Sequence, residues 1–156
     1  AILKLNSIPY KLESGKLVNS LDIAISKGTV ETIGEVGLKE LVFEAARYYS
    51  ENNKEIAVEK IWDAFERLKT YYSPTLDKPK SVGKIIDDMS DGCAGFREMY
   101  EAEFRALTKI GNDFRIRHHE TTKIDISDSR QYDYFYKRCL AIISVAILYL
   151  QGGPAA

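Results

Sequence analysis

The fold is decided by the stretch Cys139-Leu140-Ala141-Ile142-Ile143-Ser144-Val145-Ala146-Ile147-Leu148-Tyr149-Leu150. Its twelve positions are apolar or aromatic except for Ser144. A helix that spans a membrane needs about 20 apolar residues, so this stretch is too short to cross a bilayer. A helix that is apolar on nearly all sides must instead be enclosed by other elements. We therefore expect a core helix here, surrounded by further helices.

Earlier in the chain, apolar side chains recur with the 3.6-residue spacing of amphipathic helices. This spacing predicts four helices, which start near residue 38, at Asn53, at Ser81 and near residue 96. Gly111 and Asn112 stand where the fourth helix is expected to end in a left-handed cap. Asp128, with Gln131 three residues later, is close to a capping box and predicts the start of the last helix. The predicted fold class is all-α, with a five-helix bundle in a domain over residues 37–152.

Residues 1–36 lack this helical pattern and are expected to form an N-terminal extension. Tyr10 to Val18 alternate in polarity and contain Glu13-Ser14-Gly15, which predicts a small β-hairpin. The remainder, up to Gly37, reads as a linker ahead of the first helix.

Composition limits the classes of function. With 22 Lys and Arg against 23 Asp and Glu, the formal net charge is −1, so a contact with nucleic acid must come from a local patch. The 45% hydrophobic content excludes a disordered chain. The two cysteines, Cys93 and Cys139, have neither metal-site spacing nor a disulfide pattern, which favours a reducing cytoplasm as the location. No cofactor motif is expected, since glycine-rich phosphate loops are absent.

The residues that could carry chemistry are concentrated in one short stretch, which contains Asn112, Arg115, Arg117, His118 and His119. An imidazole with a pKa near 6.5 can take the proton of a ribose 2′-hydroxyl, and a guanidinium can hold the phosphate oxygens. This combination cleaves RNA to a 2′,3′-cyclic phosphate and a 5′-hydroxyl without a metal. We therefore name these five residues as candidate catalytic residues, with His118 as the base and His119 in reserve.

Two other interpretations of this stretch remain open. The basic residues could belong to a solvated helix end, where cations favour the negative pole of the helix dipole. A metal site at His118-His119-Glu120 is less favoured, because consecutive helical side chains diverge by about 100° and cannot converge on one ion. Trp62 could stack on a base, but a single Trp beside an apolar stripe more often belongs to the core.

Three segments, residues 57–70, 107–120 and 132–150, resemble the C-terminal helical domain of abortive-infection-type bacterial proteins, which belong to the HEPN superfamily. The resemblance covers about residues 38–150. It implies a helical bundle that dimerises, in phage-defence or toxin–antitoxin proteins, with a metal-independent ribonuclease site at the dimer cleft.

The active HEPN motif is an Arg, usually followed by a polar residue, and a His after four to six residues. Asn112 and His118 match it, whereas Gly111 stands where the Arg is expected, and only three residues separate Arg115 from His119. Either Arg115 or Arg117 takes over the role of the Arg, or the domain binds RNA or a partner without cutting.

The expected partners follow from these interpretations. The leading hypothesis is an RNA-directed, HEPN-type endoribonuclease that forms a homodimer, with the rings of Tyr132 to Tyr136 either at the dimer interface or covering the end of the bundle. The rival is a non-catalytic dimerisation, sensor or RNA-binding module attached to an additional effector domain; the chain begins with Ala1 rather than Met. A third hypothesis, binding of a basic partner in an antitoxin-like pair, rests on an acidic region with Asp87, Asp88, Asp91, Glu98, Glu101 and Glu103.

Overall fold

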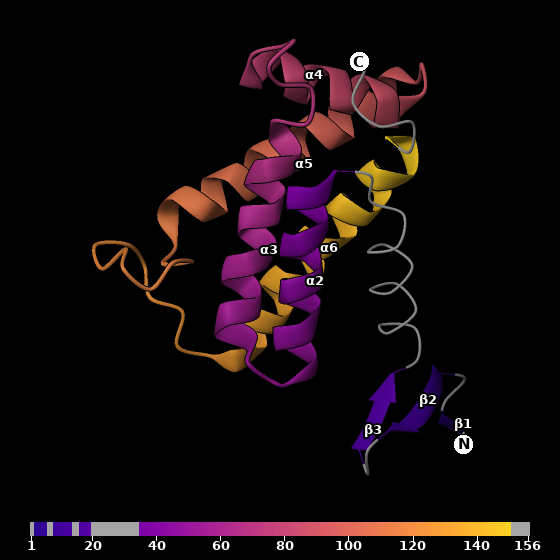
Figure 1. The fold of residues 1–156 in the computed structure, drawn as a ribbon, viewed down its shortest axis with the longest axis vertical. Helices are drawn as coiled ribbons and strands as arrows, with labels where there is room; N and C mark the ends of the chain where they lie inside the picture. Colours follow the sequence, from indigo (N-terminus) through magenta and orange to yellow (C-terminus); the bar gives the residue numbers. More distant parts are fainter. Residues whose placement is uncertain (1, 6–7, 14–15, 20–34, 151–156) are drawn as a thin grey trace.

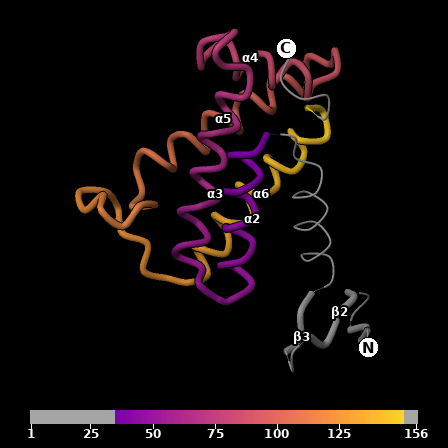
Figure 2. Tube along the Cα trace, in the orientation of Figure 1, coloured from indigo at the N-terminus to yellow at the C-terminus, as the bar shows by residue number. Residues whose placement is uncertain are grey.

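A computed structural model describes residues 2–5, 8–13, 16–19 and 35–150 of the chain, and side chains within 35–150. The described part of the chain is mostly helical, in agreement with an all-α class. Its helices, shown in Figures 1 and 2, are α2 (Val36–Ser50), α3 (Lys54–Lys69), α4 (Lys78–Ser90), α5 (Ala94–Asp113) and α6 (Ser129–Tyr149). None of the helices in these residues is long and apolar enough to cross a membrane.

The N-terminal segment contains three antiparallel strands in the order β1 (Ile2–Leu5), β2 (Ile8–Glu13) and β3 (Lys16–Asn19). Glu13 of β2 pairs with Lys16 of β3, close to the turn that the sequence predicts, although residues 14–15 of this turn lie outside the described residues. Strand β1, which the sequence did not predict, pairs with β2. The predicted linker lies mostly outside the described residues as well.

Helix α2 begins at a cap that the sequence did not reveal. The two carboxylate oxygens of Glu35 accept hydrogen bonds from the backbone N–H groups of Gly37 (3.2 Å) and Leu38 (2.6 Å). Arg67 of α3 binds the same carboxylate, with 2.7 Å between Nη2 and Oε1. Glu35 therefore caps one helix and ties it to the next, and the Arg67 guanidinium, with the two backbone N–H groups, holds the pKa of this carboxyl below its usual range despite partial burial.

Helix α4 starts earlier than the sequence suggested. Asp77, and not Ser81, is its N-cap, with its carboxylate 3.0 Å from the backbone N–H of Lys80. Pro79 is tolerated because backbone N–H groups in the first turn have no helical partner. The Ser81 hydroxyl is buried and accepts the backbone N–H of Tyr72 instead, at 3.1 Å.

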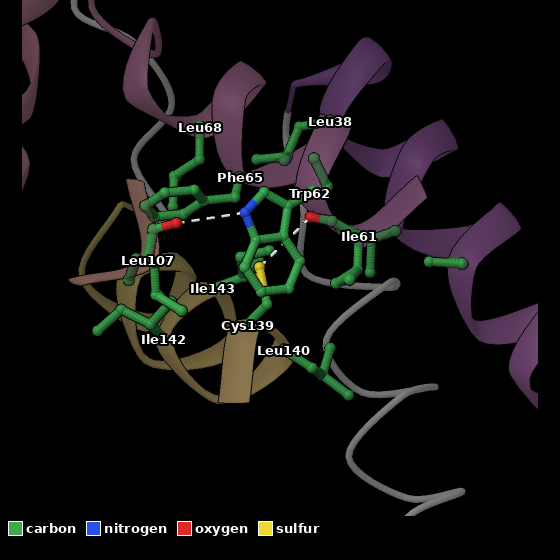
Figure 3. Close-up of a cluster of buried hydrophobic side chains, with 14 of the residues drawn as sticks. Leu38, Ile61, Trp62, Phe65, Leu68, Leu107, Cys139, Leu140, Ile142 and Ile143 are labelled. Atoms are coloured by element: carbon green, nitrogen blue, oxygen red, sulfur yellow. Dashed lines mark hydrogen bonds between the residues drawn. The ribbon is translucent and has the colours of Figure 1, made fainter. Parts of the chain in front are cut away.

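The core is centred on α3 and α6. Helices α2 and α6 both pack against α3, as Figure 1 shows, and Figure 3 shows the apolar side chains that meet there. Trp62 is 1% exposed, and its indole N–H donates to the carbonyl oxygen of Leu107 at 3.3 Å. The Cys139 thiol contacts the carbonyl oxygen of Ile61 at 3.5 Å. Trp62 is thus a core residue in this structure, where a base could not reach it.

The terminal helix is enclosed on one face only. Cys139, Ile143 and Ala146 are completely buried, whereas Leu148 and Tyr149 are 61% and 48% exposed. The prediction that this stretch is surrounded therefore holds for one side of α6. On the other side, at its C-terminal end, the described helices leave an apolar strip uncovered.

Candidate functional site

The candidate catalytic loop, residues 114–128, connects α5 to α6 and has a defined structure. Backbone hydrogen bonds join its two arms, from Arg115 N–H to the carbonyl oxygen of Ile124 (2.8 Å) and from Ile124 N–H to that of Asp113 (3.0 Å). Ile116, only 1% exposed, anchors the loop in the core. These contacts fix the backbone that carries the polar side chains of the loop. The segment is therefore an ordered loop and not the solvated end of a helix.

The guanidinium of Arg115 is engaged within the loop. Its Nε and Nη2 atoms lie 2.9 and 2.5 Å from the carbonyl oxygen of His118, and Nη1 lies 3.2 Å from a carboxylate oxygen of Asp125. Arg115 therefore closes the turn that carries the histidines. This is a positioning role, different from the phosphate clamp that the sequence suggested.

The guanidinium of Arg117 contacts α3 and not the loop turn, so it ties the loop to that helix. Its Nη2 and Nε atoms lie 2.5 and 3.1 Å from Oδ1 of Asp63, while Nη1 is 3.9 Å from Oε1 of Glu120. Glu120 also binds Lys123, and this ammonium is the main cause that lowers the pKa of the Glu120 carboxyl. The loop is thus held to α3 by a chain of alternating charges.

The two histidines project from the turn that Arg115 closes. The side chain of His118 is 81% exposed, with Nδ1 3.4 Å from Oε1 of Glu55 in the first turn of α3. His119 is exposed as well. Burial, and to a smaller extent the Glu55 carboxylate, raises the pKa of the Tyr132 phenol on α6. The loop thus presents an exposed imidazole beside the carboxylate of Glu55.

Asn112 belongs to α5 and not to the loop that carries the other four candidate residues. It belongs to the last turn of α5 and lines a groove of about 580 Å³ between α4 and α5, which none of Arg115, Arg117, His118 and His119 lines. The structure thus brings Arg115 and His118 into direct contact, ties Arg117 to α3 and places Asn112 in α5, where it lines the groove between α4 and α5.

Gly111 is helical and not the cap that the sequence suggested, because α5 continues to Asp113. A Cβ atom at this position would lie 2.8 Å from Nε1 and 3.0 Å from Cδ1 of Trp62. The indole ring of Trp62 therefore fills the space that any side chain larger than that of glycine would need at position 111.

Sequence reasoning missed the carboxylates of this region. Although Asp63 and Arg67 are four residues apart on α3, Arg67 binds Glu35 and Asp63 binds Arg117. Glu55 showed no signal beyond an acidic residue in the first turn of a helix. Only the fold brings α3 beside the loop. Among the described residues, no group of three or more His, Cys, Asp or Glu side chains is placed to hold a metal ion.

Two further surfaces were expected to contact a protein partner, namely the aromatic rings of residues 132–136 and the acidic region. Of the rings expected at a dimer interface, Phe135 and Tyr136 are buried and Tyr134 is 51% exposed. Several acidic residues of the region considered for a basic partner form ion pairs within the chain, namely Asp87 and Glu101 with Arg97, Asp88 with Lys84, and Glu103 with Arg138.

Compared with models of known protein families, with curated proteins and with solved structures, the chain matches none. The HEPN resemblance therefore stays a prediction from the sequence.

Proposed function

We propose that residues 37–152 form an RNA-directed domain of HEPN type that acts as a metal-independent endoribonuclease, in phage defence or a toxin–antitoxin system of the cytoplasm. One observation carries the proposal: Nδ1 of the exposed His118 imidazole lies 3.4 Å from a carboxylate oxygen of Glu55. A carboxylate at Nδ1 favours the tautomer with its proton on that nitrogen. The lone pair of Nε2 is then available to solvent and to a substrate.

In this reaction, Nε2 of His118 takes the proton of a ribose 2′-hydroxyl. The 2′-oxygen attacks the adjacent phosphorus, the P–O5′ bond breaks, and the leaving 5′-oxygen takes up the proton that Nε2 of His118 had accepted. The products are a 2′,3′-cyclic phosphate and a 5′-hydroxyl end. Glu55 orients the imidazole through its contact with Nδ1, as the carboxylate does in a catalytic triad. His119 is the reserve base.

The arginines take modified roles in this proposal. Arg115 is a positioning residue, because it holds the backbone carbonyl of His118. A guanidinium has five N–H donors, and Arg117 directs two of its nitrogens at Asp63. Its Nη1 group, 3.9 Å from Glu120, can still meet a phosphate oxygen. Asn112 lies on the α4–α5 groove and is not assigned a part in the chemistry.

A homodimer belongs to the proposal, because an exposed loop provides only one wall of a cleft. A second copy of the chain would supply the other wall and exclude water from the phosphate. Sedimentation velocity at micromolar concentrations should show a dimer, and a monomer throughout this range would contradict this part of the proposal.

The test is cleavage of labelled RNA in EDTA by the chain, by the double variant His118→Ala His119→Ala, and by Lys39→Ala as a control. Lys39 is exposed on α2 and lies outside the loop. We expect cleavage by the chain and the control, a loss of at least 100-fold in the double variant, and products that end in a cyclic phosphate. Equal cleavage by all three proteins, or none, would contradict the enzymatic proposal.

A second candidate function is a non-catalytic dimerisation, sensor or RNA-binding module of a larger defence protein. The engagement of both arginines with acceptors inside the chain favours it. RNA binding without cleavage, measured by fluorescence anisotropy with the same proteins, would support this candidate. An effector domain in the full-length gene would support it as well, whereas a basic toxin that copurifies would support the antitoxin-like hypothesis instead.

A further inference from the structure

Every cation of the 114–128 loop contacts a carboxylate of the same chain. These contacts join Arg115 to Asp125, Arg117 to Asp63, and Lys123 to Glu120. A phosphate that approaches the loop therefore meets cations that are already neutralised. The proposed function, on which this inference rests, requires at least one of these cations to change its partner when RNA binds.

Arg115 and Lys123 are poorly suited to such a change, because each of them also binds a backbone carbonyl group. Nε of Arg115 lies 2.9 Å from the carbonyl oxygen of His118, and Nζ of Lys123 lies 3.0 Å from that of Gly111. If either cation moved away, a carbonyl oxygen would lose this donor. Both cations are therefore fixed in the structure of the loop.

Arg117 differs, because its guanidinium contacts carboxylates and no backbone carbonyl among the described residues. Its Nη2 and Nε atoms lie 2.5 and 3.1 Å from Oδ1 of Asp63, and Nη1 lies 3.9 Å from Oε1 of Glu120. A phosphate offers the same kind of anionic oxygen, and a guanidinium binds it through two neighbouring N–H groups. Asp63 thus occupies the edge of Arg117 that would otherwise hold a phosphate.

The exchange of Asp63 for a phosphate leaves no buried charge without a partner. The side chains of Arg117 and Asp63 are 27% and 31% exposed, so water reaches both. A pair of this kind contributes little to stability. After Arg117 has left, the Asp63 carboxylate is hydrated and keeps Lys60, three residues earlier on α3, as a neighbour on the helix surface.

Asp63 also fixes the place along α3 at which the guanidinium lies. The loop contacts α3 through His118 at Glu55 and through Arg117 at Asp63, eight residues later. With a rise of 1.5 Å per residue, these two positions are about 12 Å apart along the helix axis. The candidate base and the neighbouring guanidinium are thus held at different places on α3.

We propose that Asp63 is an autoinhibitory residue of the loop. In the free protein its carboxylate occupies Arg117, and on binding an RNA phosphate displaces this carboxylate. The released guanidinium then holds the phosphate beside His118. The affinity of the free protein for RNA is accordingly lower than the cations of the loop would otherwise give.

The test is binding of fluorescein-labelled, single-stranded 2′-O-methyl RNA to the full chain in EDTA, measured by fluorescence anisotropy. The methyl groups block the 2′-oxygen as a nucleophile, so binding is measured without cleavage. The variants Asp63→Asn and Glu59→Gln each remove one negative charge from α3. Glu59, one turn earlier, is not among the carboxylates that Arg117 contacts, which makes it the matched control.

We expect Asp63→Asn to bind this RNA about two- to fivefold more tightly than Glu59→Gln, a ratio that corresponds to about 0.5–1 kcal/mol for a partly exposed ion pair. The gain should vanish without the guanidinium, so that Arg117→Ala and Arg117→Ala Asp63→Asn bind equally. A purely structural role of Asp63 predicts the opposite, namely weaker binding by Asp63→Asn. Weaker binding, equal affinity of Asp63→Asn and Glu59→Gln, or a gain that persists without Arg117 would overturn the proposal.

The failure of this proposal can be distinguished from the failure of the proposed function. If the parent chain binds RNA and Asp63→Asn binds it no more tightly than Glu59→Gln, Asp63 is not autoinhibitory, and the cleavage test with unmodified RNA decides the ribonuclease proposal separately. If the RNA binds to none of the proteins, and circular dichroism shows them to be folded, both proposals are wrong.

Discussion

At the scale of single residues, Gly111 shows how a core contact restricts the side chain that one position can carry. The position is helical, so glycine is not needed there for its backbone. It is needed for space, because a Cβ atom would come within 2.8 Å of the Trp62 indole. Trp62 is 1% exposed and bonded to Leu107, so it cannot move aside without cost.

The substitution Gly111→Ala should therefore destabilise the fold. Overpacking a core contact costs about 1–3 kcal/mol, and the better helix propensity of Ala returns about 1 kcal/mol. We expect a net loss of about 1 kcal/mol in the free energy of unfolding, measured with urea. The control is Gly83→Ala in α4, where a Cβ meets nothing within 4 Å, which should leave the protein as stable or slightly more stable. Gly111→Ala as stable as Gly83→Ala would contradict the packing argument.

The contact of Arg117 with Asp63 is a second prediction at this scale. In a double-mutant cycle with Arg117→Ala and Asp63→Asn, we expect a coupling free energy of about 0.5–1 kcal/mol, since the two side chains are partly exposed. The pair of Arg130 with Asp128 serves as the comparison, because the Arg130 side chain is 87% exposed, and its cycle should give a coupling near zero. Equal coupling in the two cycles would show that Arg117 does not tether the loop.

At the scale of elements, the 114–128 loop consists of two arms and a turn between them. Backbone hydrogen bonds and the buried Ile116 fix the two arms, while the turn that carries the histidines is exposed. Charged side chains connect the loop to α3 and α5. Lys123, for example, donates to the carbonyl oxygen of Gly111 at 3.0 Å and also pairs with Glu120.

Because this network holds Glu120 ionised, the loop should lose stability in acid. Lys123 is the main cause that lowers the pKa of the Glu120 carboxyl below its ordinary value of 4.5. A lowered pKa means that the contribution to stability is present above pH 4.5 and is lost as the pH falls through the folded-state pKa. Glu120→Gln should therefore be less stable than the parent at pH 7, and this difference should shrink below pH 4.5. Chemical denaturation over a pH series measures it, and a difference that is constant with pH would contradict this interpretation.

At the scale of the whole molecule, the helical part has one core, in which α3 is central. Its two cysteines differ in their access to solvent. Cys139 is completely buried, with Sγ 3.5 Å from the carbonyl oxygen of Ile61, and burial raises the pKa of its thiol well above the ordinary range. Cys93 is exposed at the start of α5.

Native protein should therefore react with a thiol reagent at Cys93 within minutes and at Cys139 only through unfolding. Labelling of Cys93→Ser protein as a function of urea concentration gives the free energy of the opening that exposes Cys139. Rapid labelling of Cys139 without denaturant would show that the core is open to solvent.

Particular residues show which features of the structure could be predicted from the sequence. The helices could be predicted because apolar spacing is a local property: Ile61, Phe65 and Leu68 mark one face of α3 wherever α3 lies. The start of α4 was misplaced because Asp77 and Ser81 are both good caps. The partners of Arg115 and Arg117 could not be predicted, because Asp63 is 54 residues from Arg117 and pairing over such a separation depends on the packing of α3 against the loop.

Sequence by itself determined the helical class, the approximate helices and the stretch in which imidazole and guanidinium groups gather, because periodicity and residue type are written along the chain. Tertiary structure alone decided that Trp62 occupies the space beside Gly111, that Glu55 faces His118, and that Asn112 lines the groove between α4 and α5. The physical reason is that these relations depend on distances between elements, which arise only when the helices pack around a shared core.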